Sequence, residues 1–226
     1  IRLVGSEMCI RDRYTKHKSS ALSLVRKKIQ GKEYQCFKSL CGELGSNGFL
    51  LSLSFYFILL RIVSGRCEQV LGVFVDERNS DLHKDSVGCF VNTLAVAVTI
   101  NNEDSVGEVV KSLSSDIVEN LRYRHIPFEE LLRSVPLERD ATKHPIFQVG
   151  FNFLRSPDNP ERHQSSLGFS RNERLFQSET KFDLELGVTE KEHELSYSFS
   201  YDTGVFSESF VNSLAVLYKY LITNIS

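Results

Sequence analysis

The 226-residue sequence has no Trp, one Met, five Pro and five Cys. So few cysteines exclude a disulfide scaffold for a chain of this length. Its longest apolar run, Phe49 to Leu60, contains two Ser and spans 12 residues. A membrane span needs about 20, so this run predicts a buried helix. An excess of charge is also absent, with 27 Lys and Arg against 29 Asp and Glu. We therefore expect no nucleic-acid or membrane partner.

Signatures of common catalytic sites are missing as well. The sequence contains no C-x-x-C, no G-x-S-x-G and no Gly-Lys-Ser/Thr after its glycine turn at Gly42, Gly45 and Gly48. Cys36 and Cys41 are five residues apart, while Cys67 and Cys89 are isolated. This spacing favours buried free thiols over a zinc or redox site. We expect no metal centre.

The start of the chain differs from the rest in charge. Residues 1–30 hold eight Lys or Arg but only two acidic residues. Leu3 to Arg13 reads Leu-Val-Gly-Ser-Glu-Met-Cys-Ile-Arg-Asp-Arg, without helical or strand periodicity. It matches one reading frame of a transposase-type sequencing adapter. We expect residues 1–13 to be adapter and residues 14–226 to be a fragment of a longer protein; the alternative is a natural basic leader.

The rest of the chain alternates between helical and strand patterns. Helical spacing predicts helices near 34–44, 49–63, 106–121 and 127–135, and another at 210–221 after Ser207 as N-cap. Strands are expected at 21–25, 69–75 and 94–100. Mixed helices and strands with a late meander indicate an α/β layered domain, in which helices pack on a mixed β-sheet.

Three later strands have a clear period of two, which places four apolar side chains of each strand on one face. The sets are Phe147, Val149, Phe151 and Phe153; Phe182, Leu184, Leu186 and Val188; and Leu195, Tyr197, Phe199 and Tyr201. The last two strands, joined by residues 189–194, are expected to form a hairpin. We interpret Asp183, Glu185 and Glu190 as solvated edge charges.

Three segments carry a resemblance to a known family. Val87 to Leu94 reads Val-Gly-Cys-Phe-Val-Asn-Thr-Leu, Ile126 to Leu132 contains Pro-Phe-Glu, and Arg139 to Val149 reads Arg-Asp-Ala-Thr-Lys-His-Pro-Ile-Phe-Gln-Val. In order and spacing they resemble the later core motifs of nonribosomal peptide synthetase condensation domains, across roughly residues 20–226. The resemblance implies one chloramphenicol-acetyltransferase-like lobe, the C-terminal part of such a domain.

The sequence also departs from the family pattern. Tyr123 and Arg124 stand where the family has a His-Gln pair, and Thr142 and Lys143 replace its Ser-Arg. The family's catalytic His-His-x-x-x-Asp-Gly is not in this sequence, which has no two adjacent His and no His followed four residues later by Asp. We assign no catalytic residue, and we interpret the remaining candidates as non-catalytic: His125, His144, His163 and His193.

The resemblance implies a reaction and its partners. Condensation domains have two lobes with a tunnel between them, where carrier proteins present substrates on phosphopantetheine arms and an amide bond forms. The resemblance implies three partners: the N-terminal lobe, peptidyl or aryl carrier proteins, and an adjacent adenylation domain. It implies a cytoplasmic setting and no directly bound cofactor. We expect the fragment alone to be inactive. The alternatives are a non-catalytic carrier-docking lobe of a degenerate domain, or another acyltransferase of the superfamily.

Six residues of the motifs are singled out. Asn92 is the candidate substrate-binding residue, and the alternative is that its amide caps the turn before the strand. Arg139 and Asp140 are expected to form a charge-assisted pair that fixes a loop. Gly88 and Thr93 are expected to be structural, and Pro127 to begin a short helix.

Overall fold

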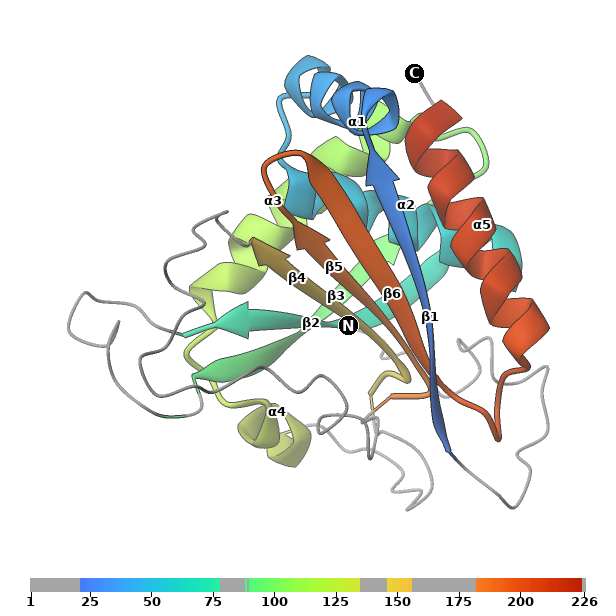
Figure 1. The fold of residues 1–226 in the computed structure, drawn as a ribbon. Helices are drawn as coiled ribbons and strands as arrows, with labels where there is room; N and C mark the ends of the chain where they lie inside the picture. The colour runs from blue at the N-terminus through green and yellow to red at the C-terminus, as the bar shows by residue number, and fades with distance from the viewer. Residues whose placement is uncertain (1–20, 78–87, 89, 135–145, 156–181, 225–226) are drawn as a thin grey trace, which may run out of the picture.

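The computed structural model describes residues 21–77, 88, 90–134, 146–155 and 182–224. Six strands form one mixed sheet in the order β1-β6-β5-β4-β2-β3. The elements follow in the order β1 (Leu22–Gln30), α1 (Lys32–Glu43), α2 (Gly48–Ser64), β2 (Glu68–Asp76), β3 (Val91–Thr99), α3 (Val106–Arg122), α4 (Phe128–Ser134), β4 (Val149–Arg155), β5 (Leu184–Glu190), β6 (Glu194–Asp202) and α5 (Glu208–Asn224). This arrangement confirms the α/β fold class (Figure 1).

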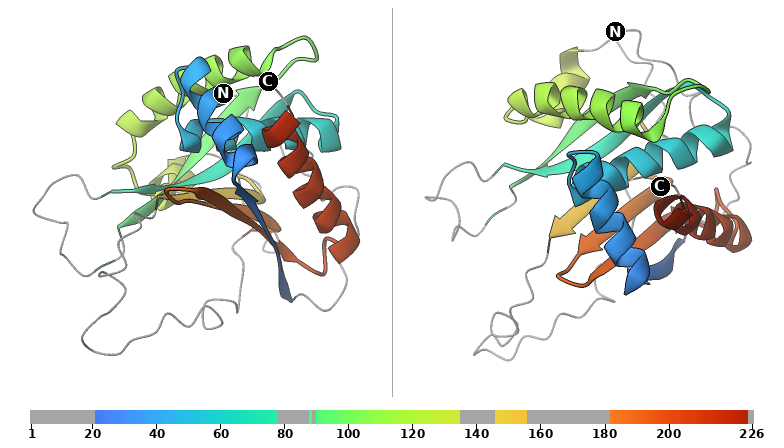
Figure 2. Two further views of the ribbon diagram at one scale, coloured as in Figure 1. Left: turned by 45° about the horizontal axis from the view of Figure 1, so that its top comes forward. Right: turned by 90° about the horizontal axis from the view of Figure 1, so that it is seen from above.

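The sheet carries four helices on one face. Figure 2 shows α1, α2, α3 and α5 together on one side of the strands, and α4 lies apart from them beyond β2 and β3 in Figure 1. Strand β4 runs parallel to both β2 and β5, whereas the β1–β6, β5–β6 and β2–β3 pairs are antiparallel. The expected hairpin of β5 and β6 is confirmed. We call the side that bears the four helices the helix face and the other side the open face.

Helix α2 is the centre of the core, as its apolar composition predicts. The Asn47 side chain caps it by accepting a hydrogen bond from the Leu50 amide at 2.9 Å, and Gly65 ends it in the left-handed conformation. Leu51, Phe55 and Leu59 are completely buried. Among the described residues no single helix is long and apolar enough to cross a membrane; α1 and α2 pass that test only as a pair bent by 99°.

Two further helices begin where the sequence predicts. Ser105 and Glu108 form a reciprocal capping box at the start of α3. The Ser207 hydroxyl accepts a hydrogen bond from the Phe210 amide at 3.3 Å at the start of α5, which confirms the expected N-cap.

Strand β1 is longer than the sequence indicates. The expected end at Val25 is wrong, because the strand continues through three basic residues to Gln30 and pairs with β6 over its whole length. The charged residues are tolerated because β1 is an edge strand, where their side chains reach solvent. Period-two counting missed this, since Arg26, Lys27 and Lys28 do not alternate with apolar residues.

The predicted common face fails for two of the twelve apolar side chains. Phe147 and Phe182 precede the first residues of β4 and β5, so strand alternation does not govern them. Both rings lie on the open face, over glycines that have no side chain there. Phe151, Leu186 and Phe199, by contrast, are completely buried in the core on the helix face.

Candidate functional site

Asn92, the second residue of β3, joins two of the motifs. Its side chain is 7 % exposed. The amide nitrogen donates to the carbonyl oxygens of Arg124 and Ile126, both at 2.7 Å. The amide oxygen accepts from the backbone N–H groups of Thr93 at 2.8 Å and Phe128 at 3.3 Å. The four bonds fix the orientation of the amide, because a flipped amide would place its oxygen against two carbonyl oxygens.

These contacts hold the segment between α3 and α4 against β3. The alternative from the sequence, an amide that caps the turn before the strand, does not account for the three bonds to residues 32 to 36 positions away. The predicted substrate contact of Asn92 stays a prediction. Any such contact competes with bonds that already use both donors and the oxygen of the amide.

An aromatic cluster connects the same segment to the beginnings of β4 and β5. Phe128 packs against Phe147 with ring centroids 5.4 Å apart, and Phe147 packs against Phe182 at the same distance. Phe74 of β2 completes it at 5.7 Å from Phe182. We call Phe74, Phe128, Phe147 and Phe182 the open-face aromatic cluster. Each of the second and third family motifs contributes one ring to it.

Two paired glycines make room for this cluster. Gly72 of β2 faces Gly150 of β4 in the sheet. A Cβ at Gly72 would lie 2.1 Å from Cε2 of Phe147, and one at Gly150 would lie 2.5 Å from Cδ2 of Phe182. The rings therefore pack directly on the backbone of the sheet, which only glycine permits.

The other motif residues are less closely involved. Thr93 is half-buried and faces Phe74 across the β2–β3 pair. Gly88 is exposed, and a Cβ there would lie 3.1 Å from the Phe90 ring. Pro127 is exposed immediately before α4, and its carbonyl oxygen accepts from the Glu130 amide at 2.9 Å. Arg139 and Asp140 lie outside the described residues, as does their expected ion pair.

The three acidic residues at β5 are not solvated edge charges. Strand β5 lies between β4 and β6, so it is not an edge. Glu190 is 5 % exposed and pairs with the Lys38 ammonium at 2.9 Å, beside Gly48 at the start of α2. On the open face, burial raises the pKa of the Glu185 carboxyl above its usual value. The interpretation from sequence was wrong because alternation identifies a face but not the position of a strand in the sheet.

Comparison with known proteins identifies this arrangement. The sequence profile of the condensation domain matches residues 10–226. The chain belongs to the condensation-domain family. Its sequence is 28 % identical over 188 residues to gramicidin S synthase 2 of Aneurinibacillus migulanus, covering 83 % of this chain and 4 % of the synthase. It is 31 % identical over 181 residues to phosphinothricin tripeptide synthetase PhsC of Streptomyces viridochromogenes, covering 78 % of this chain and 16 % of the synthetase.

Solved structures show the same fold. A four-domain nonribosomal peptide synthetase bound to AMP and glycine superposes with a TM-score of 0.79 at 19 % identity, over 92 % of this chain and 17 % of that one. The condensation domain of the monacolin K polyketide synthase gives a TM-score of 0.75 at 14 % identity, over all of this chain and 52 % of that one. The chain thus spans about half of that condensation domain and a small part of the curated synthetases. The chloramphenicol-acetyltransferase-like lobe fold expected from the motifs is confirmed.

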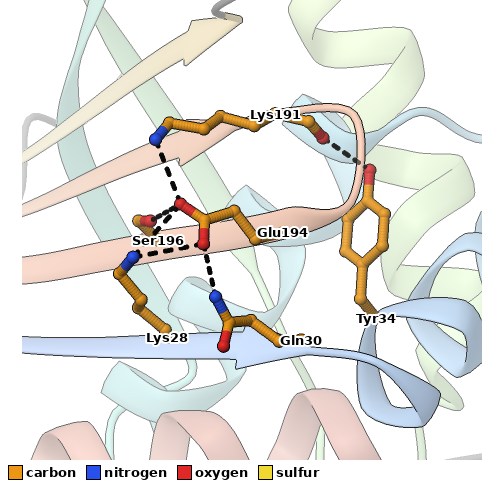
Figure 3. A network of polar contacts seen from close by, with 6 residues as sticks. All are labelled: Lys28, Gln30, Tyr34, Lys191, Glu194 and Ser196. Carbon is orange, nitrogen blue, oxygen red and sulfur yellow. Dashed lines mark hydrogen bonds and ion pairs between the residues drawn. The ribbon is translucent and has the colours of Figure 1, made fainter. Parts of the chain in front are cut away.

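A polar network at the β5–β6 turn fixes the edge of this condensation-domain sheet (Figure 3). Glu194 accepts hydrogen bonds from Gln30 and Lys28 of β1, and from Lys191 and Ser196 next to the turn. The Gln30 bond, followed by those from the two Lys and Ser196, lowers the pKa of Glu194 from 4.5 to about 2. The network binds β1 to the hairpin.

The cysteines and histidines of the described residues differ in burial. Cys41 is buried, as expected, and burial raises the pKa of its thiol to about 11. The expectation of burial is wrong for Cys36 and Cys67, which are exposed. His125 and His193 are exposed. Within the described ranges no group of His, Cys, Asp and Glu could hold a metal ion. The candidate site therefore consists of the segment held by Asn92 and the open-face aromatic cluster, in which Phe147 and Phe182 are buried.

Proposed function

We propose that residues 14–226 form the C-terminal lobe of a condensation domain that joins carrier-bound acyl or aminoacyl groups through an amide bond. The observation that carries this proposal is the family match across residues 10–226, in a chain that spans about half of a solved condensation domain. The acceptor amine attacks the donor thioester carbonyl. A C–N bond forms, the C–S bond breaks, and the amine proton ends on the departing thiol.

In this proposal the chain supplies a wall and a scaffold for the reaction. The base that takes the amine proton comes from the His-His-x-x-x-Asp-Gly motif of the preceding lobe, because this sequence contains no such motif. The open-face aromatic cluster and the Asn92 segment give the wall its shape. Holding two tethered reactants between two lobes makes the reaction effectively intramolecular, which lowers the entropic part of its barrier.

The partners follow from the same proposal. Phosphopantetheine arms of peptidyl or aryl carrier proteins deliver both substrates, and an adenylation domain activates one of them. The solved four-domain synthetase that shares this fold supports a multidomain setting. Since adenylation consumes ATP, we place the reaction in the cytoplasm. Residues 1–13 are a sequencing-adapter translation in this proposal, and sequencing the genomic region upstream of residue 14 tests that part.

The reaction is tested with the complete condensation domain that contains this chain. Donor and acceptor carriers are loaded with thioesters, and mass spectrometry detects whether an amide product appears on the acceptor carrier. Product formation supports the proposal. Carrier binding without product supports the alternative, a docking lobe of a degenerate domain. The synthetases among the relatives favour the catalytic function.

A further inference from the structure

We propose that Asn92 is a positioning residue, a clip that fastens residues 124–128 to β3 and thereby places Phe128 in the open-face aromatic cluster. Three of its four hydrogen bonds reach a segment more than 30 residues away along the chain. No comparably placed polar side chain among the described residues joins β3 to this segment. The effect on catalysis that follows from this inference rests on the proposed function; the clip itself does not.

The segment depends on such a clip because its own structure is weak. Helix α3 ends at Arg122, and turns at Tyr123, Arg124 and Ile126 follow, each closed by one backbone hydrogen bond of 3.0 to 3.3 Å. Tyr123 and Ile126 are 54 % and 39 % exposed. The following helix α4 has seven residues, too few to be stable without tertiary contacts. The bonds from Asn92 supply part of that contact in a buried position.

These contacts connect the three family motifs in turn. Asn92 belongs to the first motif, and its side-chain oxygen accepts a hydrogen bond from the backbone amide of Phe128 in the second motif. The Phe128 ring then packs on Phe147 of the third motif, which covers Gly72. A change at Asn92 therefore reaches the open face through Phe128. The side chain itself does not have to touch substrate.

The chemistry of the amide makes the test specific. Asn92→Asp keeps the size of the side chain but replaces the NH2 donor with an oxygen. That oxygen would face the Arg124 and Ile126 carbonyl oxygens at the observed 2.7 Å. The two attractive contacts would become repulsive, and this second oxygen of a buried carboxylate would lack a donor. Asn92→Ala removes the clip without introducing charge, and it serves as the second variant.

Hydrogen exchange measured by mass spectrometry on the complete condensation domain tests the clip without any ligand. Both variants are expected to exchange at least tenfold faster in peptides covering residues 123–131, with β5 and β6 peptides unchanged. Asn212→Asp is the control, since Asn212 is half-buried on α5 and its solvent-exposed side-chain bond is local, to the Glu208 carbonyl. Unchanged exchange at 123–131 would overturn the proposal, and so would an equal rise in every peptide.

Steady-state kinetics then separates positioning from substrate contact. Positioning predicts that both variants lower kcat at least tenfold, while KM for the loaded carriers changes less than twofold. Raised KM with unchanged kcat and unchanged exchange would instead assign Asn92 to substrate binding. If the wild-type domain forms no amide, the proposed function fails. The exchange result still shows whether Asn92 fastens residues 124–128 to β3.

Discussion

Gly72 and Gly150 set the shape of the open face at the scale of single residues. Each lacks a Cβ at a point where an aromatic ring contacts the backbone, and the two stand opposite each other in neighbouring strands. A glycine within a strand pattern indicates a bulge or the close approach of another group, but it does not identify that group. The ring that approaches Gly72 belongs to Phe147, which is far from Gly72 along the chain.

Gly72→Ala is expected to destabilise the protein by about 1–3 kcal/mol, because the new methyl overlaps the Phe147 ring and either the ring or the strand must shift. Urea denaturation measures the change in the free energy of unfolding. Gly42→Ala is the matched control: it lies within α1 with nothing within 4 Å of the new Cβ. It should stabilise the protein by about 0.5–1 kcal/mol. Equal stability of Gly72→Ala and wild type would contradict the packing described.

Cysteine reactivity follows from burial. Cys41 is buried with a pKa near 11, while Cys36 and Cys67 are exposed. Because the thiolate is the reactive form, iodoacetamide at pH 8 should label Cys36 and Cys67 in the folded protein and reach Cys41 only after unfolding. Peptide mapping by mass spectrometry measures this. Rapid labelling of Cys41 in the native protein would show that α1 does not pack as described.

At the scale of elements, sequence periodicity identified nearly all helices and strands, with ends correct to within a few residues. It failed where a tertiary partner decides the outcome. Strand β1 continues past Val25 because β6 offers nine partner residues, and Lys28 is held by Glu194. The burial of Glu190 could not be foreseen either, because its partner Lys38 comes from α1.

The attachment of β1 predicts a pH dependence of stability. The folded pKa of Glu194, about 2, lies below the ordinary value of 4.5. A lowered folded pKa contributes stability that is present above about pH 4.5 and is lost as pH falls toward 2. In Glu194→Gln this loss should be smaller, so the free energy of unfolding should depend less on pH between 4.5 and 2.

Urea titrations at several pH values in that range compare Glu194→Gln with wild type. Glu192→Gln is a suitable control, since the side chain of Glu192 is 69 % exposed. It should reproduce the wild-type pH profile. Identical profiles for Glu194→Gln and wild type would show that the carboxylate network does not stabilise the folded edge strand.

At the scale of the whole molecule, the motifs predicted the family and the lobe, whereas the composition and periodicity of the residues alone reached only an α/β layered domain. Neither the motifs nor the composition and periodicity predict the order of the strands. That order depends on pairings such as that of β1 with β6, more than 160 residues apart. The candidate site was predicted in part. Asn92 was singled out, but the three partners that hold it in place lie 32 to 36 residues further along the chain.

The central claim is that this lobe condenses carrier-bound substrates only together with the lobe that precedes it. The most direct measurement is amide formation from two loaded carriers, followed by mass spectrometry, with the 226-residue chain alone and with the preceding lobe added as a separate chain. We predict no product from the chain alone and product when both lobes are present. Product from the chain alone, or none from a folded complex of both lobes, would contradict the account.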